Sequence, residues 1–310
     1  MFRRLIFNFY FICQSLFFRK SNVILSNNAH CLIKNNHNLI ASIPKKIWIY
    51  WHDCNIPEIV RYCIQNIIEL HPDYEIHVLN KETIQEFIDI DIEKLSLIMP
   101  VANLSDLIRL KLLKKYGGTW LDASIILEDN LTNFFSDNQG KYEILGFYNA
   151  YQSIGCEIPV IESWLLSAPP NSEFISKWLE YFEPVMKLGA EGLYNNFKKH
   201  ANFEELCKGL GDPKYLIVYI AAKLAYNDML CKSNMLFYCC DDSAFSVQIY
   251  SKWITRKCIS NLYIKEKFIF SPVYKLTSGD RKYYDFLKKY KLINNRSIVG
   301  KFIERLSKDD

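Results

Sequence analysis

Residues 105–127 read SDLIRLKLLKKYGGTWLDASIIL, and this stretch decides the fold. Its apolar positions recur at helical spacing as far as Tyr116, which predicts a helix that the glycines 117–118 end. β-forming residues follow on both sides of Asp122. Asp122 is therefore expected at the C-terminal end of a strand, which is where open α/β sheets bind their ligands.

The residues before this stretch predict two strand–helix units. The apolar run 46–51 indicates a buried strand, and Pro57 begins a helix that extends to about His71. Residues 74–79 then alternate as a second strand, and 81–88 return to helical spacing. This order is typical of an α/β fold with a parallel sheet. Later elements are expected to be helices over 172–187, 193–200 and 214–230, and short strands over 234–238 and 268–274.

The composition is that of a globular protein with a full core. The chain has 310 residues, of which 50% are apolar and 15% aromatic, and these values exclude a disordered or fibrous protein. The ten cysteines form no CxxC pair and no zinc-binding spacing, so we interpret them as reduced thiols. Together with the lack of a small-residue cleavage site after an apolar stretch, this favours a cytosolic protein.

Positive charge is concentrated near the C-terminus. The net charge is +4, but residues 252–310 hold 15 Lys and Arg against 6 Asp and Glu. Such a tail suits contact with an anionic surface such as phosphorylated lipid or an anionic glycan, or it is a solvated helix around 288–291. The tail has no interleaved aromatic platform and no helix-turn-helix signal, so we expect no nucleic-acid partner.

Residues 1–20 form a separate hydrophobic and basic segment. Mostly apolar residues over 5–18 lie between the basic pairs 3–4 and 19–20. They fall short of the roughly 20 residues that a membrane-spanning helix needs. The segment is therefore either an interfacial membrane anchor, for which its aromatic residues are suited, or a first helix docked on the protein. The following residues, 21–42, are rich in Asn and Ser and are interpreted as a linker.

Asp106 and Arg109 are the first candidate ligand-binding residues. They stand three apart on the predicted helix and share a face. A guanidinium offers a planar fork of donors and a carboxylate offers acceptors, so the two together can grip sugar hydroxyls and phosphate oxygens. The alternative is a surface ion pair worth under about 1 kcal/mol. Under either interpretation we expect the removal of Arg109 to cost little stability.

Asp122 and the two glycines before its strand are further candidates. Asp122 can anchor a divalent cation that neutralises a departing diphosphate, or it can simply cap a turn. Gly117 and Gly118 permit a backbone conformation closed to other residues and let the chain approach a ligand closely. As a lone dipeptide they would indicate no more than a helix cap.

Three ordered motifs occupy residues 43–127: IPKKIWIYW at 43–51, SDLIR at 105–109 and YGGTWLDA at 116–123. Together they resemble the capsular polysaccharide synthesis family and the wider DxD glycosyltransferases of family 32, which are similar to the catalytic domains of large clostridial glucosylating toxins. Weaker similarity continues through 162–164 and 271–277. The resemblance implies a GT-A-type, Rossmann-like α/β domain with a mixed sheet and additional helices. Its halves would be a nucleotide-sugar-binding part over 43–150 and an acceptor-side part with the basic tail over 151–310.

By position, the resemblance also implies roles for individual residues. Trp51 would stack on the nucleotide base, and Trp48, at odd spacing from it, would lie in the core. Asp106 and Arg109 would hold the donor sugar. Asp122 would serve the metal or the ribose. The further residues expected at the cofactor are Gly117, Gly118 and Ser124.

Two residues depart from the family pattern. Ser124 stands where DxD has its second carboxylate, and Tyr274 stands where many relatives have His. A neutral hydroxyl is a far poorer cation ligand than a carboxylate. Either the metal is held more weakly, or Glu128 or Asp129 supplies a ligand, or the cation depends mainly on the diphosphate.

The predicted function is transfer of a sugar from a nucleotide-sugar donor to a glycan or lipid-linked acceptor, with retention of configuration, in capsular or lipopolysaccharide synthesis. The expected cofactor is Mn²⁺ or Mg²⁺, although Ser124 weakens that expectation. The expected location is the cytoplasm, with a candidate contact to the inner face of the membrane. The alternative function is a non-catalytic protein that binds a nucleotide-sugar or a glycan on the same fold.

Overall fold

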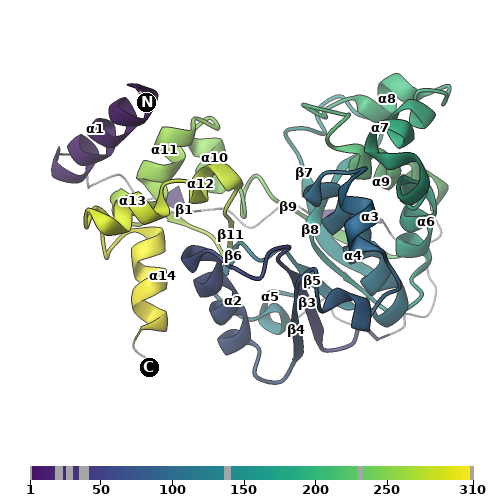
Figure 1. The fold of residues 1–310 in the computed structure, drawn as a ribbon, viewed down its shortest axis with the longest axis horizontal. Helices are drawn as coiled ribbons and strands as arrows, with labels where there is room; N and C mark the ends of the chain where they lie inside the picture. The colour runs from purple at the N-terminus through teal and green to yellow at the C-terminus, as the bar shows by residue number, and fades with distance from the viewer. Residues whose placement is uncertain are drawn as a thin grey trace.

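The computed structural model describes residues 2–17, 24–25, 31–34, 42–135, 141–229 and 233–307, and these form a mixed sheet of seven strands with helices on both faces (Figure 1). In spatial order the strands are β2 (Cys31–Lys34), β9 (Met235–Cys239), β7 (Ile144–Asn149), β8 (Val160–Ala168), β5 (Gly118–Leu121), β3 (Lys46–Tyr50) and β4 (Glu75–Leu79). Strand β3 is parallel to β4 and β5, whereas β8 is antiparallel to β5 and β7. The predicted α/β fold with a mixed sheet is confirmed.

The helices divide into those that cover the main sheet and those that form a second part beside it (Figure 1). Up to residue 228 they are α2 (Glu58–Leu70), η1 (Ile84–Glu86), α3 (Ile92–Ser96), α4 (Val101–Tyr116), α5 (Leu131–Phe134), α6 (Glu173–Phe182), α7 (Val185–Phe197), α8 (Phe203–Cys207) and α9 (Ile217–Asp228). The second part contains α1 (Phe2–Phe17), α10 (Ser246–Tyr250), α11 (Thr255–Ile259), η2 (Ser260–Ile264), α12 (Ser278–Arg281), α13 (Tyr284–Lys289) and α14 (Ile298–Leu306).

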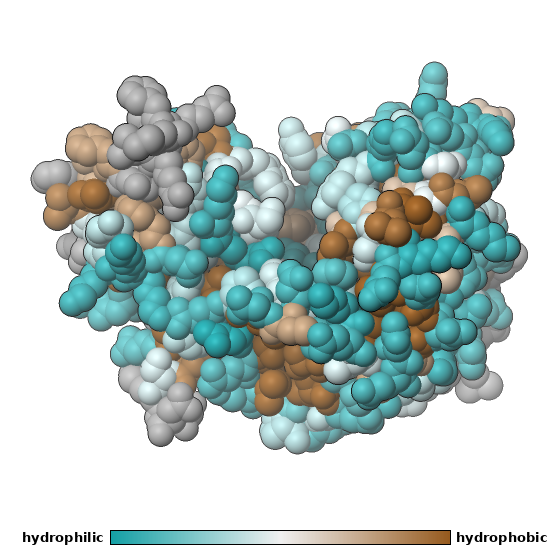
Figure 2. Space-filling model, in the orientation of Figure 1, coloured by the Kyte–Doolittle hydropathy of each residue, from teal (hydrophilic) through white to brown (hydrophobic). Residues whose placement is uncertain are grey.

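One short strand pair connects the second part to the rest of the chain, and another lies within the second part. Strand β6 (Ile125–Leu127) pairs antiparallel with β11 (Val273–Lys275), and β1 (Ile24–Leu25) pairs parallel with β10 (Ile269–Phe270). The pairing of β6 with β11 matters for the site, because it brings residues that lie far apart in the sequence next to the end of β5. The space-filling view is hollowed between the side that carries α10–α13 and the side that carries α6–α9 (Figure 2).

Alternation along β3 separates two hydrophobic cores. Trp48 is fully buried in the core that also contains residues of α4, α6 and α9, whereas Ile47 and Ile49 belong to the opposite core, which contains residues of α2. Trp51 packs partly buried in this second core, so it lies on the other side from Trp48. The core position predicted for Trp48 is confirmed, and its indole Nε1 donates a hydrogen bond to the carbonyl of Gly117 at 2.9 Å.

The helix before Asp122 forms as its sequence predicts. Helix α4 begins after Pro100, whose fixed φ suits a helix start, and ends at Gly117 with a φ of 64°. The strand over β3, the helix after Pro57 and the strand over β4 are also confirmed. The helix predicted over 81–88 is shorter than expected: within these residues the structure has the single 3₁₀ turn η1.

Long-range pairing corrects three expectations about the chain's organisation. The segment 21–42, interpreted as a linker, contributes β1 and the edge strand β2, while the rest of it lies outside the described residues. The division at residue 150 falls between β7 and β8, which pair with each other, so a single sheet takes strands from both halves. The strand over 125–127 forms, but it joins β11 and not the main sheet.

Helix α1 docks on the second part of the protein through one face. Phe11 is fully buried, and the ring of Phe7 stacks on Tyr283 with centroids 5.4 Å apart. The hydroxyl of Ser260 donates to the side chain of Gln14 at 3.0 Å. The other face leaves apolar side chains exposed. Among the helices that the structure describes, none is long and apolar enough to cross a membrane.

Candidate active site

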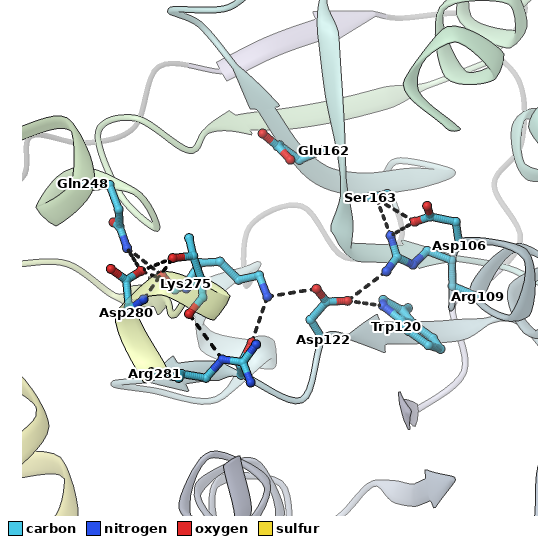
Figure 3. Close-up of polar contacts among 12 residues, drawn as sticks. Asp106, Arg109, Trp120, Asp122, Glu162, Ser163, Gln248, Lys275, Asp280 and Arg281 are labelled. Atoms are coloured by element: carbon cyan, nitrogen blue, oxygen red, sulfur yellow. Dashed lines mark hydrogen bonds and ion pairs between the residues drawn. The ribbon is translucent and has the colours of Figure 1, made fainter. Parts of the chain in front are cut away.

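Asp122 directly follows β5 and lies at the centre of a network of charged side chains (Figure 3). Its Oδ1 accepts hydrogen bonds from Nη2 of Arg109 and from Nε1 of Trp120, both at 2.9 Å. Its Oδ2 pairs with Nζ of Lys275 at 2.9 Å. The backbone amide of Asp122 donates to the carbonyl of Trp164, which ties the end of β5 to β8. The carboxylate is still accessible, because 26% of the side chain is exposed.

Asp106 and Arg109 share a face of α4, as predicted, but this face is buried. Their side chains are 11% and 5% exposed. Nη1 of Arg109 donates to Oδ1 of Asp106 at 2.8 Å and also to Oγ of Ser163 on β8. The guanidinium also lies over the ring of Trp120, 5.0 Å from its centroid. The alternative of a surface ion pair is therefore wrong. We now expect the loss of Arg109 to lower stability, because it would leave buried carboxylates without their counter-charge.

Lys275 completes the network, and it lies within the weak similarity over 271–277, which gave it no role. In the pairing of β11 with β6, Lys275 lies opposite Ile125. Its Nζ donates to Oγ of Ser124 at 3.0 Å as well as contacting Asp122. The preceding Tyr274 points to the other side of the strand, where its hydroxyl donates to a backbone carbonyl in its own hairpin at 2.8 Å. Tyr274 therefore does not occupy the site.

Trp51 lies just beyond β3, and α12 brings Arg281 against it. The guanidinium of Arg281 is 5.1 Å from the centroid of the indole ring, a cation–π distance. Nε of Arg281 donates to the carbonyl of Thr277 at 3.3 Å. Burial lowers the pKa of Arg281, and the negative charge of Asp122 is among the charges that oppose this shift. The structure thus links the predicted base-stacking residue to the charged network around Asp122.

Gly117 and Gly118 lie at the start of β5, whereas Asp122 follows its end. A Cβ on Gly117, whose φ is +64°, would lie 2.5 Å from the nitrogen of Pro170. A Cβ on Gly118, whose φ is +93°, would lie 2.5 Å from the carbonyl oxygen of Lys46. Glycine is therefore required for backbone conformation and packing. These glycines therefore have a structural role, which is to connect α4 to β5, and their contact with the donor stays a prediction.

The side chains around Asp122 do not fit a divalent cation. Both carboxylate oxygens of Asp122 and the hydroxyl of Ser124 bond to nitrogen donors. Glu128 pairs with Lys267 at 2.9 Å, and Asp129 bonds to the first turn of α5, so both alternative ligands are engaged elsewhere. Across the described ranges, no group of three or more His, Cys, Asp or Glu side chains is placed to hold a metal ion. Mg²⁺ and Mn²⁺ prefer several oxygen ligands, which this cluster does not offer.

The network shifts the pKa values of its two carboxyl groups in opposite directions. Burial raises the pKa of Asp106 to about 6, although Arg109 opposes this effect. Burial also favours the neutral form of Asp122, but the charges of Lys275 and Arg109 outweigh it and lower that pKa to about 2. Asp122 has two cationic partners and Asp106 has one, and the second cation lowers the pKa of Asp122 further.

The raised pKa of Asp106 predicts a pH-dependent difference between the wild type and Asp106→Asn. The folded-state pKa of Asp106 lies above its ordinary value, so the folded protein favours the protonated carboxyl. The stability that this preference contributes is fully present below about pH 4 and is lost as the pH rises from about 4 to about 6. Over this range the wild type should lose on the order of 2 kcal/mol relative to the variant. Urea unfolding of both proteins at a series of pH values checks this, and parallel stability curves would contradict it.

Glu162 on β8 is a second buried carboxyl near the network (Figure 3). Its Oε2 accepts a hydrogen bond from Tyr219 at 2.7 Å, and its Oε1 accepts one from Asn149 at 3.2 Å. Burial raises the pKa of Glu162. A carboxyl in such surroundings is suited to exchange a proton with a substrate. Glu162 lies within the weak similarity over 162–164, which predicted no role for it.

Comparisons with known sequences agree with the motifs. Residues 19–209, more than half of the chain, match the family described as capsular polysaccharide synthesis protein. The chain is 29% identical over 175 residues to O-glycosyltransferase braB of Annulohypoxylon truncatum, a match that covers 50% of this chain and 40% of the relative. It is 37% identical over 85 residues to glycosyltransferase afumC of Aspergillus fumigatus, covering 26% and 21%. The matched regions span less than half of the length of both relatives.

The solved structures that match the chain are distant in sequence and in structure. The PaToxG glycosyltransferase is 15% identical, with a TM-score of 0.35, and the match covers 72% of this chain and 84% of that one. The galactosyltransferase LgtC, solved in complex with donor and acceptor sugar analogues, is 15% identical, with a TM-score of 0.30 and coverage of 63% and 87%. The sequence match over 19–209 includes all three motifs of the resemblance and stops before Lys275. The chain belongs to the capsular polysaccharide synthesis protein family.

Proposed function

We propose that the chain is a glycosyltransferase that moves a sugar from a nucleotide-sugar donor to the hydroxyl of a glycan or lipid-linked acceptor, with retention of configuration. The observation that carries the proposal is the network at the end of β5, where Asp122 is joined to Arg109 and Asp106 of α4. A strand-end carboxylate held by a guanidinium presents both acceptors and donors to a sugar phosphate. The names of the two curated relatives support the reaction class.

In this proposal Arg109 and Asp122 act on the donor as one unit. Three acceptors from α4, β5 and β8 hold the guanidinium of Arg109, so its orientation is fixed before a ligand arrives. Fixed charges of this kind stabilise the charge that develops on a departing diphosphate and need little reorganisation. Trp51 stacks on the nucleotide base, an interaction worth about 1–3 kcal/mol per base.

The biological setting we propose is surface polysaccharide assembly, either capsule or lipopolysaccharide. Its support is the description of the family, capsular polysaccharide synthesis protein. The O-glycosyltransferase name of one relative supports a hydroxyl group as the acceptor.

The first test is to identify the donor by thermal shift. The melting temperature of the purified chain is measured with UDP-, GDP-, CDP- and dTDP-linked sugars, and the matching free sugars serve as controls. One donor class should raise the melting temperature, because a ligand at 100 times its dissociation constant adds about 2.7 kcal/mol of stability. If no nucleotide-sugar raises it more than its free sugar does, the proposal fails.

We also propose that the protein is cytoplasmic and attaches peripherally to a membrane through α1. The docked helix leaves three apolar side chains on its outer face, Phe9, Ile12 and Leu16, with exposures of 71%, 39% and 68%. Aromatic and aliphatic side chains on such a face can enter the headgroup boundary. Arg256 lies next to this helix, 6.0 Å from the ring of Tyr10, and adds positive charge suited to anionic lipid.

Replacing Phe9, Ile12 and Leu16 by Ser should release the protein from anionic vesicles while the fold is kept. The changed side chains lie outside the buried contacts of α1, so the melting temperature should stay close to that of the wild type. The control replaces two exposed leucines elsewhere, Leu97 and Leu188, and should leave vesicle binding unchanged. Co-sedimentation with phosphatidylserine vesicles is the measurement. Equal binding by the α1 variant and the wild type would exclude this attachment.

A further inference from the structure

Lys275 places an ammonium group between the two polar side chains of the Asp122-Ala123-Ser124 motif (Figure 3). Its Nζ lies 2.9 Å from Oδ2 of Asp122 and 3.0 Å from Oγ of Ser124. These are the first and third positions of the motif, whose side chains would be the ones to hold a cation if both were carboxylates. The positive charge at this point is therefore supplied by the chain itself.

The backbone fixes Lys275 in this position from both sides. The amide of Lys275 donates to the carbonyl of Ala244 at 2.9 Å, and its carbonyl accepts from Nε2 of Gln248 at 2.9 Å. The next amide, of Leu276, donates to the carbonyl of Ser124 at 2.9 Å. Because the strand is held by these bonds and the side chain is 11% exposed, the ammonium has little freedom to leave Asp122.

Asp122 already has a cationic partner on each of its carboxylate oxygens. Arg109 pairs with Oδ1 and Lys275 with Oδ2, so the charge of this carboxylate is compensated without a metal ion. A divalent cation would meet the ammonium of Lys275 and would find one carboxylate where a DxD site offers two.

We propose that Lys275, with Arg281 of α12, binds the diphosphate of the donor in place of a divalent cation, so that the reaction needs no metal. This inference rests on the proposed function. In the transfer, the bond between the anomeric carbon and the diphosphate oxygen breaks, and its electron pair stays on the diphosphate. The anomeric carbon forms a new bond to the acceptor hydroxyl oxygen, whose proton passes to the departing diphosphate. Lys275 stabilises the negative charge that this step places on the leaving group.

The first arm of the test measures binding of inorganic pyrophosphate by calorimetry in the presence of EDTA. The wild type should bind, and Lys275→Met should bind about 10-fold or more weakly, because it lacks one charge-assisted contact. The matched control is Lys267→Met, since Lys267 is 9% exposed and also pairs with a carboxylate at 2.9 Å, outside this site. Lys275→Arg keeps the charge and should retain part of the binding even if the Met variant folds poorly. Equal loss in the control and the Met variant, or no pyrophosphate binding by the wild type, would overturn the proposal.

The second arm asks whether the site takes a metal, by electron paramagnetic resonance of Mn²⁺ titrated into the protein. The wild type should leave Mn²⁺ free in solution. The double variant Ser124→Asp with Lys275→Met restores two carboxylates without the ammonium and should bind Mn²⁺. Mn²⁺ binding by the wild type that Asp122→Asn removes would overturn the proposal, and so would a double variant that folds and leaves Mn²⁺ free.

The third arm separates this inference from the proposed function. Release of nucleoside diphosphate from the donor should proceed equally in EDTA and in Mn²⁺. Release that EDTA abolishes would overturn the inference and leave the proposed function standing. Metal-free pyrophosphate binding that depends on Lys275, with no release from any donor, would overturn the proposed function and leave the anion site standing.

Discussion

Asp122→Asn is expected to lower kcat/KM for the donor by on the order of 100-fold to 1,000-fold, as the loss of a charged contact in the transition state does. The NH2 group of the Asn side chain would face Arg109 or Lys275, which also carry N–H donors, so at least one of these contacts would be lost. The variant should also lose on the order of 2 kcal/mol of stability at neutral pH, because the folded state lowers the pKa of this carboxyl to about 2. Steady-state kinetics and urea unfolding measure the two effects.

The matched control for this variant is Glu128→Gln. Glu128 is 30% exposed against 26% for Asp122, and each pairs with a lysine at 2.9 Å. Its partner Lys267 lies outside the network, so Glu128→Gln should lose some stability and keep normal kinetics. The two variants together separate catalytic loss from the general cost of breaking an ion pair. Normal turnover in Asp122→Asn would remove Asp122 from the site.

Arg109→Ala is expected to have the largest combined effect on stability and activity. It removes the hydrogen-bond donor to Asp106, Asp122 and Ser163 at once. The arginine side chain is 5% exposed, so water cannot replace these bonds. Removing one partner of a buried ion pair typically costs about 3–5 kcal/mol. Catalytic efficiency should fall by on the order of 100-fold or more in the protein that remains folded. Thermal unfolding and kinetics on the same preparation check both values.

Arg109→Lys distinguishes the geometry of the guanidinium from its charge. A lysine keeps the positive charge near Asp106 and should recover much of the stability. It cannot direct two nitrogens to Asp106 and Asp122 at the same time, so kcat/KM should stay low. If the Lys variant recovers both stability and activity, charge alone is needed, and the role assigned to the planar guanidinium is wrong.

The sequence predicts those parts of the fold that rest on local patterns. The helix α4, its end at Gly117 and the strand that leads to Asp122 follow from apolar spacing and glycine, so they were found within a residue or so. The same holds for β3 and α2. Trp48 and Trp51 were separated correctly because side chains alternate along a strand.

The missed features depend on contacts between distant parts of the chain. Strand β8 is buried along its whole length, so it shows no alternation of apolar and polar residues, and Glu162 and Ser163 interrupt its apolar run. Strand β2 pairs with β9 some 200 residues later, which no local pattern indicates. Lys275 reaches Ser124 across 151 positions. The burial of Arg109 was missed because spacing on one helix says nothing about what packs against it.

The most direct test of the proposed glycosyltransferase is whether the purified chain releases nucleoside diphosphate from the nucleotide-sugar that raises its melting temperature. Release is followed by chromatography for the wild type, for Asp122→Asn and for the control Lys267→Met. We predict release by the wild type and by the control, and a loss of on the order of 100-fold or more in Asp122→Asn. Donor binding without release by the wild type, with acceptor glycans supplied, would contradict the account and would identify the chain as a nucleotide-sugar-binding protein.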